Sequence, residues 1–108
     1  MLCDHYQNMA KQLDIYPKDR SLVCHALGLC GEAGEVADKI KKVYRDNNGE
    51  FTPDKYEEIA YELGDVLWYL ANVADDIGYP LSTIASMNLT KLFDRKSRNK
   101  LGGSGDLR

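Results

Sequence analysis

Two pairs of acidic residues are notable in this sequence because the members of each pair are three positions apart. Glu32 and Glu35 form the first pair, and Glu62 and Asp65 form the second. Residues three apart in an α-helix lie on the same face, one turn from each other. Each pair can therefore hold one cation if its segment is helical.

The two pairs share a sequence context. Glu-Ala-Gly-Glu-Val at 32–36 matches Glu-Leu-Gly-Asp-Val at 62–66, acid for acid and glycine for glycine. If two helices pack through these equivalent faces, four carboxylates converge, and their charges repel unless a cation or protons neutralise them. Ligation by oxygen alone favours Mg2+, with Mn2+ as the alternative, over zinc or copper. The competing interpretation is that these acids form the solvated face of amphipathic helices.

Four further residues are suited to meet a phosphate group. Lys39 continues the face of the first acidic pair one turn further on. Asn88, Lys91 and Arg95 follow one another in steps of three and four, which places an amide, an ammonium and a guanidinium on one helical face. All four are thus placed to meet a phosphate, and the competing interpretation is that they are solvated surface residues.

The elements that position these residues are predicted to be helices. Apolar residues recur in steps of three and four along four segments, at about 2–13, 19–44, 52–77 and 82–100. Thr52 followed by Pro53 predicts the start of the third helix, and Ser82 is the expected N-cap of the fourth.

The fold class follows from these four segments and from the absence of any long alternation of apolar and polar residues. We predict an all-α four-helix bundle. The domain is expected to cover residues 1–101, and the glycine-rich segment 102–108 is expected to be a flexible tail.

Other residues inside the predicted helices need a structural reason. Gly28, Gly31, Gly34 and Gly64 each cost a helix about 1 kcal/mol relative to alanine, which predicts close approach of another helix or of a ligand. His25 has no partner at metal-ligand spacing, and we interpret it as a structural or surface residue.

Composition excludes several classes of function. The net charge of -3 offers no basic excess for a nucleic-acid polymer. No apolar run approaches the roughly 20 residues of a membrane span, and the first residues lack the features of a signal peptide. The expected location is therefore the cytoplasm, without membrane contact.

The order of these motifs resembles a known family. Residues 27–36, 62–70 and 88–95 are similar to the MazG-like branch of the all-α nucleoside triphosphate pyrophosphatases, in the small stand-alone form of bacteria and phages. The resemblance implies Mg2+-dependent hydrolysis of a nucleoside triphosphate between its α and β phosphates, which yields the monophosphate and pyrophosphate. The substrate is a ribonucleotide or a deoxynucleotide such as dGTP.

The resemblance also implies a quaternary structure and residue roles. Helices of the bundle would associate between subunits in a homodimer or homotetramer. By position, the implied metal ligands are Glu32, Glu35, Glu62 and Asp65, and the implied phosphate contacts are Asn88, Lys91 and Arg95. We interpret Glu35 as the general base, although Glu32 and Glu62 remain alternatives.

Two different functions compete with this interpretation. A di-iron bundle would need Glu-x-x-His pairs, and the acids at positions 35 and 65 disfavour it. A non-enzymatic helical dimerisation protein would carry the same apolar periodicity without using its acids.

Overall fold

A computed structural model describes all residues from 1 to 108 and consists of helices and their connections, without strands. The elements are α1 (Cys3–Gln12), a 3-10 turn η1 (Lys18–Arg20), α2 (Ser21–Asp46), α3 (Pro53–Asp76) and α4 (Leu81–Ser97). The prediction of an all-α fold with four helices is confirmed. None of these helices combines the length and the apolar character that crossing a membrane requires.

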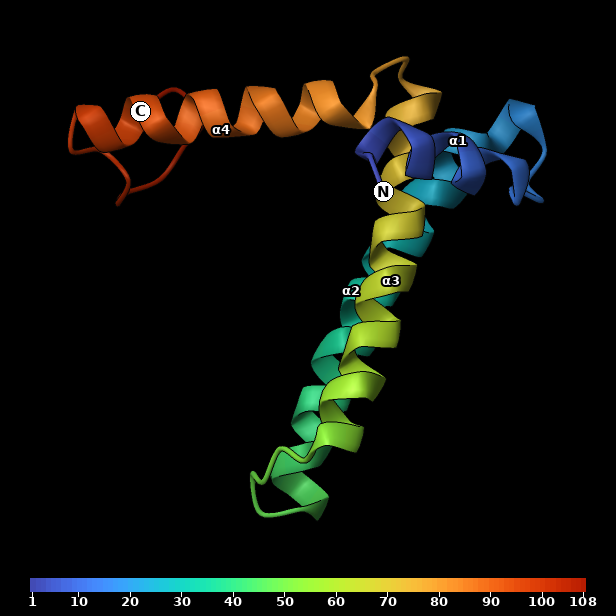
Figure 1. Cartoon of the computed structure of the whole chain (residues 1–108), viewed down its shortest axis with the longest axis vertical. Coiled ribbons are helices and arrows are strands. Elements are labelled where there is room, and N and C mark those ends of the chain that lie inside the picture. Colours follow the sequence, from blue (N-terminus) through green and yellow to red (C-terminus); the bar gives the residue numbers. More distant parts are fainter.

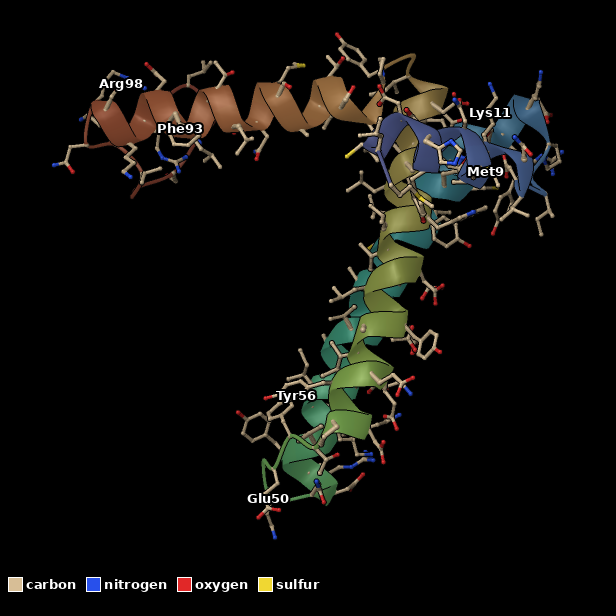
Figure 2. The ribbon with its side chains drawn as sticks, in the orientation of Figure 1. Met9, Lys11, Glu50, Tyr56, Phe93 and Arg98 are labelled. Carbon is tan, nitrogen blue, oxygen red and sulfur yellow. The ribbon has the colours of Figure 1, made fainter.

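The two long helices, α2 and α3, form an antiparallel hairpin (Figure 1). Asn48 and Gly49 adopt positive φ angles of 53° and 74° in the connection, which reverses the chain. Thr52 then caps α3, because its side-chain oxygen accepts a hydrogen bond from the backbone N–H of Lys55 at 3.3 Å. Figure 2 shows Glu50 and Tyr56 at this tip of the hairpin, far from α1.

The hairpin buries only part of its apolar side chains. Val43 is fully enclosed, and Val36 and Val66 are half-buried. Leu63, in contrast, leaves 52% of its surface exposed, and Leu67 leaves 42%. A pair of helices covers one stripe of each partner, so the rest of the apolar face remains open.

The short helix α1 lies across the end of the hairpin and holds the joint between α3 and α4. The side chain of Gln7 donates to the carbonyl oxygens of Ala71 at 3.3 Å and Tyr79 at 3.0 Å. Its own oxygen accepts from the backbone N–H of Leu81 at 2.9 Å. Beside it, Ala10 packs with Ala71 and Leu81 in a small buried cluster.

Helix α4 stands out sideways from the hairpin (Figure 1). It contacts α1 and α3 but not α2. The expectation that Ser82 caps this helix is wrong, because α4 already begins at Leu81. Asp4 of α1 supplies the missing acceptors instead: its carboxylate binds the backbone N–H of Ser82 at 2.9 Å and the Ser82 hydroxyl at 2.6 Å.

A buried histidine links three segments at the same end of the molecule. His25 is 1% exposed, with Nε2 2.9 Å from Asp14 Oδ1 and Nδ1 2.6 Å from Asp76 Oδ2. Burial favours a neutral ring, but the hydrogen bonds and charges of Asp76 and Asp14 outweigh it and raise the pKa of His25 above its usual value. The interpretation of His25 as structural fits these contacts.

The chain is extended for its length. Only 10 of its 108 residues are buried. The radius of gyration is 16.7 Å, whereas a compact domain of this length has about 13 Å. Because only α2 and α3 run along each other within one chain, the four-helix bundle with helices from several subunits stays a prediction.

Candidate functional site

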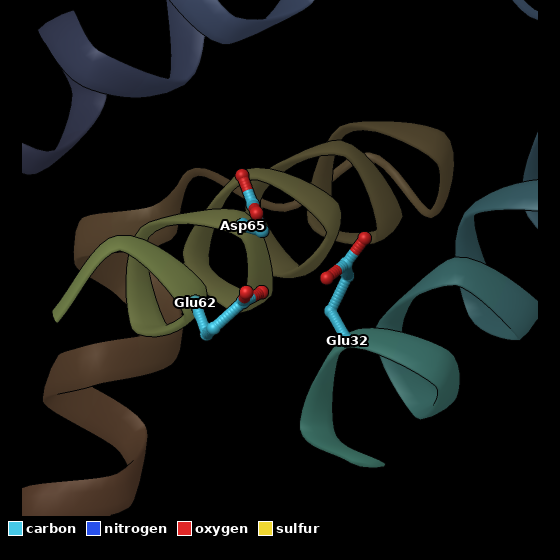
Figure 3. A group of neighbouring side chains, drawn as sticks. All are labelled: Glu32, Glu62 and Asp65. Carbon is cyan, nitrogen blue, oxygen red and sulfur yellow. The ribbon is translucent and has the colours of Figure 1, made fainter. Parts of the chain in front are cut away.

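Three of the predicted acids converge in the middle of the hairpin. Glu32 extends from α2 toward Glu62 and Asp65 of α3 (Figure 3). One carboxylate oxygen from each residue lies within 4.8 Å of the other two. The three-residue spacing on α3 brings Glu62 and Asp65 to one face, and the antiparallel packing brings Glu32 opposite them. We call these three residues the acidic group.

The three carboxylates of the acidic group lie close enough together for their negative charges to repel one another. Partial burial raises the pKa of Glu32, and the charges of Asp65, Glu62 and Glu35 raise it further. A positive charge that joined the group would stabilise the ionised form of Glu32.

The donor set fits a hard divalent cation. All three ligands are carboxylates, and no histidine or cysteine belongs to the group. Mg2+ and Mn2+ prefer such oxygen ligands, whereas zinc and copper prefer imidazole or thiolate. Glu32 and Glu62 are half-buried and Asp65 is exposed, so the group is open to an ion and to a substrate.

Glu35, the fourth predicted ligand, does not belong to the acidic group. It lies on the next turn of α2 and is exposed. Its charge is nevertheless close enough to raise the pKa of Glu32. Its roles as a ligand and as a general base stay predictions.

An aromatic pair lies next to the acidic group and was not predicted. The hydroxyl oxygens of Tyr69 and Tyr16 are 2.9 Å apart. That hydrogen bond, together with burial and the charges of Glu32 and Asp65, raises the pKa of Tyr69 to about 12. In the sequence, Tyr69 lies four residues after Asp65, on the same helical face.

The glycines near the acids fall into two kinds. A β-carbon at Gly28 would overlap the ring of Tyr69, so the prediction of a close approach is confirmed there. Gly31, Gly34 and Gly64 have no atom of another element within 4 Å of the place of a β-carbon. These three glycines are therefore open to something outside the chain.

Lys39 lies further along α2 than the acids, beside a cavity. This cavity, of about 200 Å³, is lined by Lys39, Lys42 and Lys55 together with acidic and neutral residues. Lys42 is occupied by an ion pair with Asp38 at 2.7 Å. Lys39 has no ion-pair partner, so its ammonium group is available to a phosphate.

Asn88 and Lys91 line a cavity of about 350 Å³ at the joint between α3 and α4. The rest of this wall is largely apolar, formed by Ile77, Tyr79, Ile84 and Met87. Such a cavity combines an apolar surface with two polar groups, as sites for small organic ligands do.

Arg95 is 4% exposed and is covered by the C-terminal segment. One of its terminal nitrogens donates to the backbone oxygen of Asp106 at 2.7 Å. The contact with Asp106 was not predicted, and no local pattern in the sequence indicates it.

The predicted site residues therefore lie on two separate parts of the chain, the hairpin and α4. The acidic group lies on the hairpin, whereas Asn88, Lys91 and Arg95 lie on α4, which does not contact α2. In Figure 2, Phe93 and Arg98 mark how far α4 extends from the hairpin.

Comparisons with known proteins identify the family of this chain. The family described as MazG nucleotide pyrophosphohydrolase domain matches residues 22–98, a range that contains every predicted site residue. A relative, the Gene 37 protein of Mycobacterium phage L5, is 42% identical over an alignment 114 positions long, which covers the whole of both chains. No solved structure matches the chain. The chain belongs to the MazG nucleotide pyrophosphohydrolase family.

Proposed function

We propose that this protein is a Mg2+-dependent nucleoside triphosphate pyrophosphohydrolase. It hydrolyses the bond between the α and β phosphates and releases a nucleoside monophosphate and pyrophosphate. The observation that carries the proposal is the convergence of Glu32, Glu62 and Asp65 within 4.8 Å of one another. Three carboxylates this close repel one another, and a bound cation would relieve the repulsion, while membership of the family supports a nucleotide substrate.

The acids and bases of the chain have distinct tasks in this reaction. Glu32, Glu62 and Asp65 would hold Mg2+, which offsets the charge of the phosphates and makes a nearby water easier to deprotonate. Glu35 is exposed on the adjacent turn and takes the proton of the attacking water. The water oxygen bonds to phosphorus while the bridging P–O bond breaks, and pyrophosphate leaves.

The phosphate contacts in this proposal come from basic and amide side chains outside the acidic group. Lys39 extends along the same helix as Glu32, and seven residues of α-helix correspond to about 10.5 Å of rise. Its long side chain reaches back toward the phosphates. Asn88, Lys91 and Arg95 supply an amide and two further positive charges from α4.

The position of α4 leads us to infer that the working site lies between subunits. Within one chain α4 turns away from the hairpin, so its phosphate-binding residues would meet the acidic group of another copy. The exposed leucines of the hairpin, such as Leu63 and Leu67, and the open positions of Gly34 and Gly64 provide a surface for close helix packing. A homodimer or homotetramer satisfies both requirements.

A non-enzymatic dimerisation protein is the alternative, and the exposed apolar surface fits it equally well. That surface therefore does not discriminate between the two functions. The acidic group does, because a dimerisation protein gains nothing from clustered like charges at the centre of its hairpin.

The test is a product assay with purified protein, Mg2+ and a panel of ribonucleoside and deoxyribonucleoside triphosphates, including dGTP. We expect monophosphate and pyrophosphate in equal amounts, and no products when EDTA removes the metal. Glu62→Gln should lose this activity, whereas Glu57→Gln, an exposed acid on the same helix, should retain it. A diphosphate product, or full activity in Glu62→Gln, would contradict the proposal.

A further inference from the structure

The C-terminal segment folds back onto α4. It brings the carboxylate of Asp106 close to two basic side chains of that helix, Lys91 and Arg95. Asp106 Oδ1 lies 3.2 Å from Lys91 Nζ and 3.5 Å from a terminal nitrogen of Arg95. The same nitrogen of Arg95 donates to the backbone oxygen of Asp106 at 2.7 Å. Asp106 thus binds Lys91 and Arg95, the two side chains that contact the phosphates in the proposed function.

The segment keeps this shape through its own hydrogen bonds. Arg108 donates to the backbone oxygens of Leu101 at 3.1 Å, Gly102 at 3.0 Å and Gly105 at 2.6 Å. Gly103 and Gly105 adopt positive φ angles of 91° and 87°, which favour glycine. Arg98 of α4 donates to the backbone oxygen of Arg108 at 2.7 Å.

The chemistry of the contact is that of an anion site. Carboxylate and phosphate oxygens accept the same charge-assisted hydrogen bonds from lysine and arginine. Arg95 is almost fully buried, so its guanidinium depends on acceptors of this kind. Asp106 is 84% exposed and Lys91 41%, and an ion pair so open to water is weak. A polyphosphate, with more charge, is able to replace it.

We propose that Lys91 and Arg95 form an anion site which Asp106 fills in the free chain, so that the phosphates of the nucleotide compete with the protein's own tail. The proposal rests on the proposed function and adds its regulation. Nucleotide binding to the free protein is inhibited in proportion to the fraction of molecules in which Asp106 contacts Lys91 and Arg95. The bound nucleotide, in turn, releases residues 102–108.

The size of the effect follows from the population of the docked tail. A ligand that binds only the open form has its apparent affinity reduced by the fraction of open molecules. For an exposed ion pair, this corresponds to about a two- to fivefold weakening. Removing the Asp106 charge should therefore raise the apparent affinity for the ligand by about the same two- to fivefold factor.

The experiment uses the full chain and inorganic pyrophosphate as the probe, in magnesium-free buffer, observed by 15N NMR. Asp106→Asn removes the charge, and Arg108→Ala removes the hydrogen bonds that fold the tail. Asp19→Asn is the matched control, because Asp19 is an exposed acid distant from α4 in the sequence. We expect pyrophosphate to bind about two- to fivefold more tightly to both tail variants, with no change in the control.

The tail itself gives the second readout. In the unmodified chain, pyrophosphate should move the amide signals of Gly102, Gly103 and Gly105 to the positions that they have in Asp106→Asn. Equal pyrophosphate affinity in all chains, or binding that leaves the glycine signals in place, would overturn the proposal. Neither measurement depends on hydrolysis, so an inactive protein would refute the proposed function without deciding the competition at the anion site.

Discussion

The ring of Tyr69 on α3 lies directly against the backbone of Gly28 on α2, where a β-carbon would overlap it. This contact holds the two helices close together one turn before Glu32. It also sets the position of the Tyr69 hydroxyl, 2.9 Å from that of Tyr16.

Gly28→Ala is therefore expected to destabilise the protein. Forcing a methyl group into this contact should cost about 1 to 3 kcal/mol of the free energy of unfolding, although alanine is the better helix former. Thermal or urea unfolding measures the change. Gly31→Ala is the control, because its β-carbon meets nothing in the chain. Equal stability of Gly28→Ala and the unmodified protein would show that Tyr69 moves away without cost.

The acidic group should respond to Mg2+ even in the absence of substrate. Binding to the folded state alone raises the unfolding temperature with metal concentration. We expect this rise in the unmodified protein. Asp65→Asn should lose both the rise in unfolding temperature and nearly all hydrolysis. Asp65→Asn should keep its helical circular dichroism signal, because the substitution removes charge and little volume. A magnesium-induced rise that persists in Asp65→Asn would take this residue out of the metal site.

The role of Glu35 can be separated from that of the acidic group. If Glu35 accepts the proton of the attacking water, Glu35→Gln should lower kcat about 100-fold or more. The magnesium-induced rise in unfolding temperature should remain, since Glu35 lies outside the group. Loss of both properties together would instead identify Glu35 as a ligand.

The buried His25 network predicts a pH dependence of stability. Because the pKa of His25 is raised, its contribution is complete below about pH 6.5 and is lost as the pH rises through the folded-state value. Burial raises the pKa of Asp14, but hydrogen bonds from Tyr16 and His25 lower it overall, so its contribution is lost on acidification below about pH 4. The stability that His25 adds should thus be greatest between these limits.

His25→Ala tests this by urea unfolding at several pH values. The variant should lose about 3 kcal/mol near pH 5, since it leaves two partly buried carboxylates without their partner. The loss should shrink above neutral pH. His5→Ala, an exposed histidine on α1, is the control. A loss that does not change with pH would mean that His25 acts through packing alone.

The exposed apolar surface predicts self-association. Light scattering at micromolar concentration should give at least the mass of a dimer. Leu63→Glu should shift the protein toward monomer and reduce activity in parallel, if the site lies between subunits. Ile15→Glu, which changes an exposed residue outside the hairpin, should do neither. An active monomer would place the whole site within one chain.

Local patterns in the sequence predicted the helices, because an apolar period of three and four and the Thr52-Pro53 signal depend on near neighbours. They also identified the acids, since a spacing of three fixes a helical face. They did not separate Glu35 from the acidic group, because that depends on how α2 and α3 pack. The two carboxylate partners of His25 are 11 and 51 positions away, and no periodicity reveals such a contact.

The capping of α4 by α1 bears on the order of events during synthesis. Asp4 and Gln7 are made well before their partners Ser82, Leu81 and Tyr79, which follow more than 70 residues later in the chain. A ten-residue helix is marginal on its own, and α1 lacks these partners until the end of α3 and the start of α4 have been made. The hairpin is able to form from local contacts as it emerges. We expect α1 to dock only when the start of α4 appears, which makes its docking the step that commits the nascent chain to its final topology.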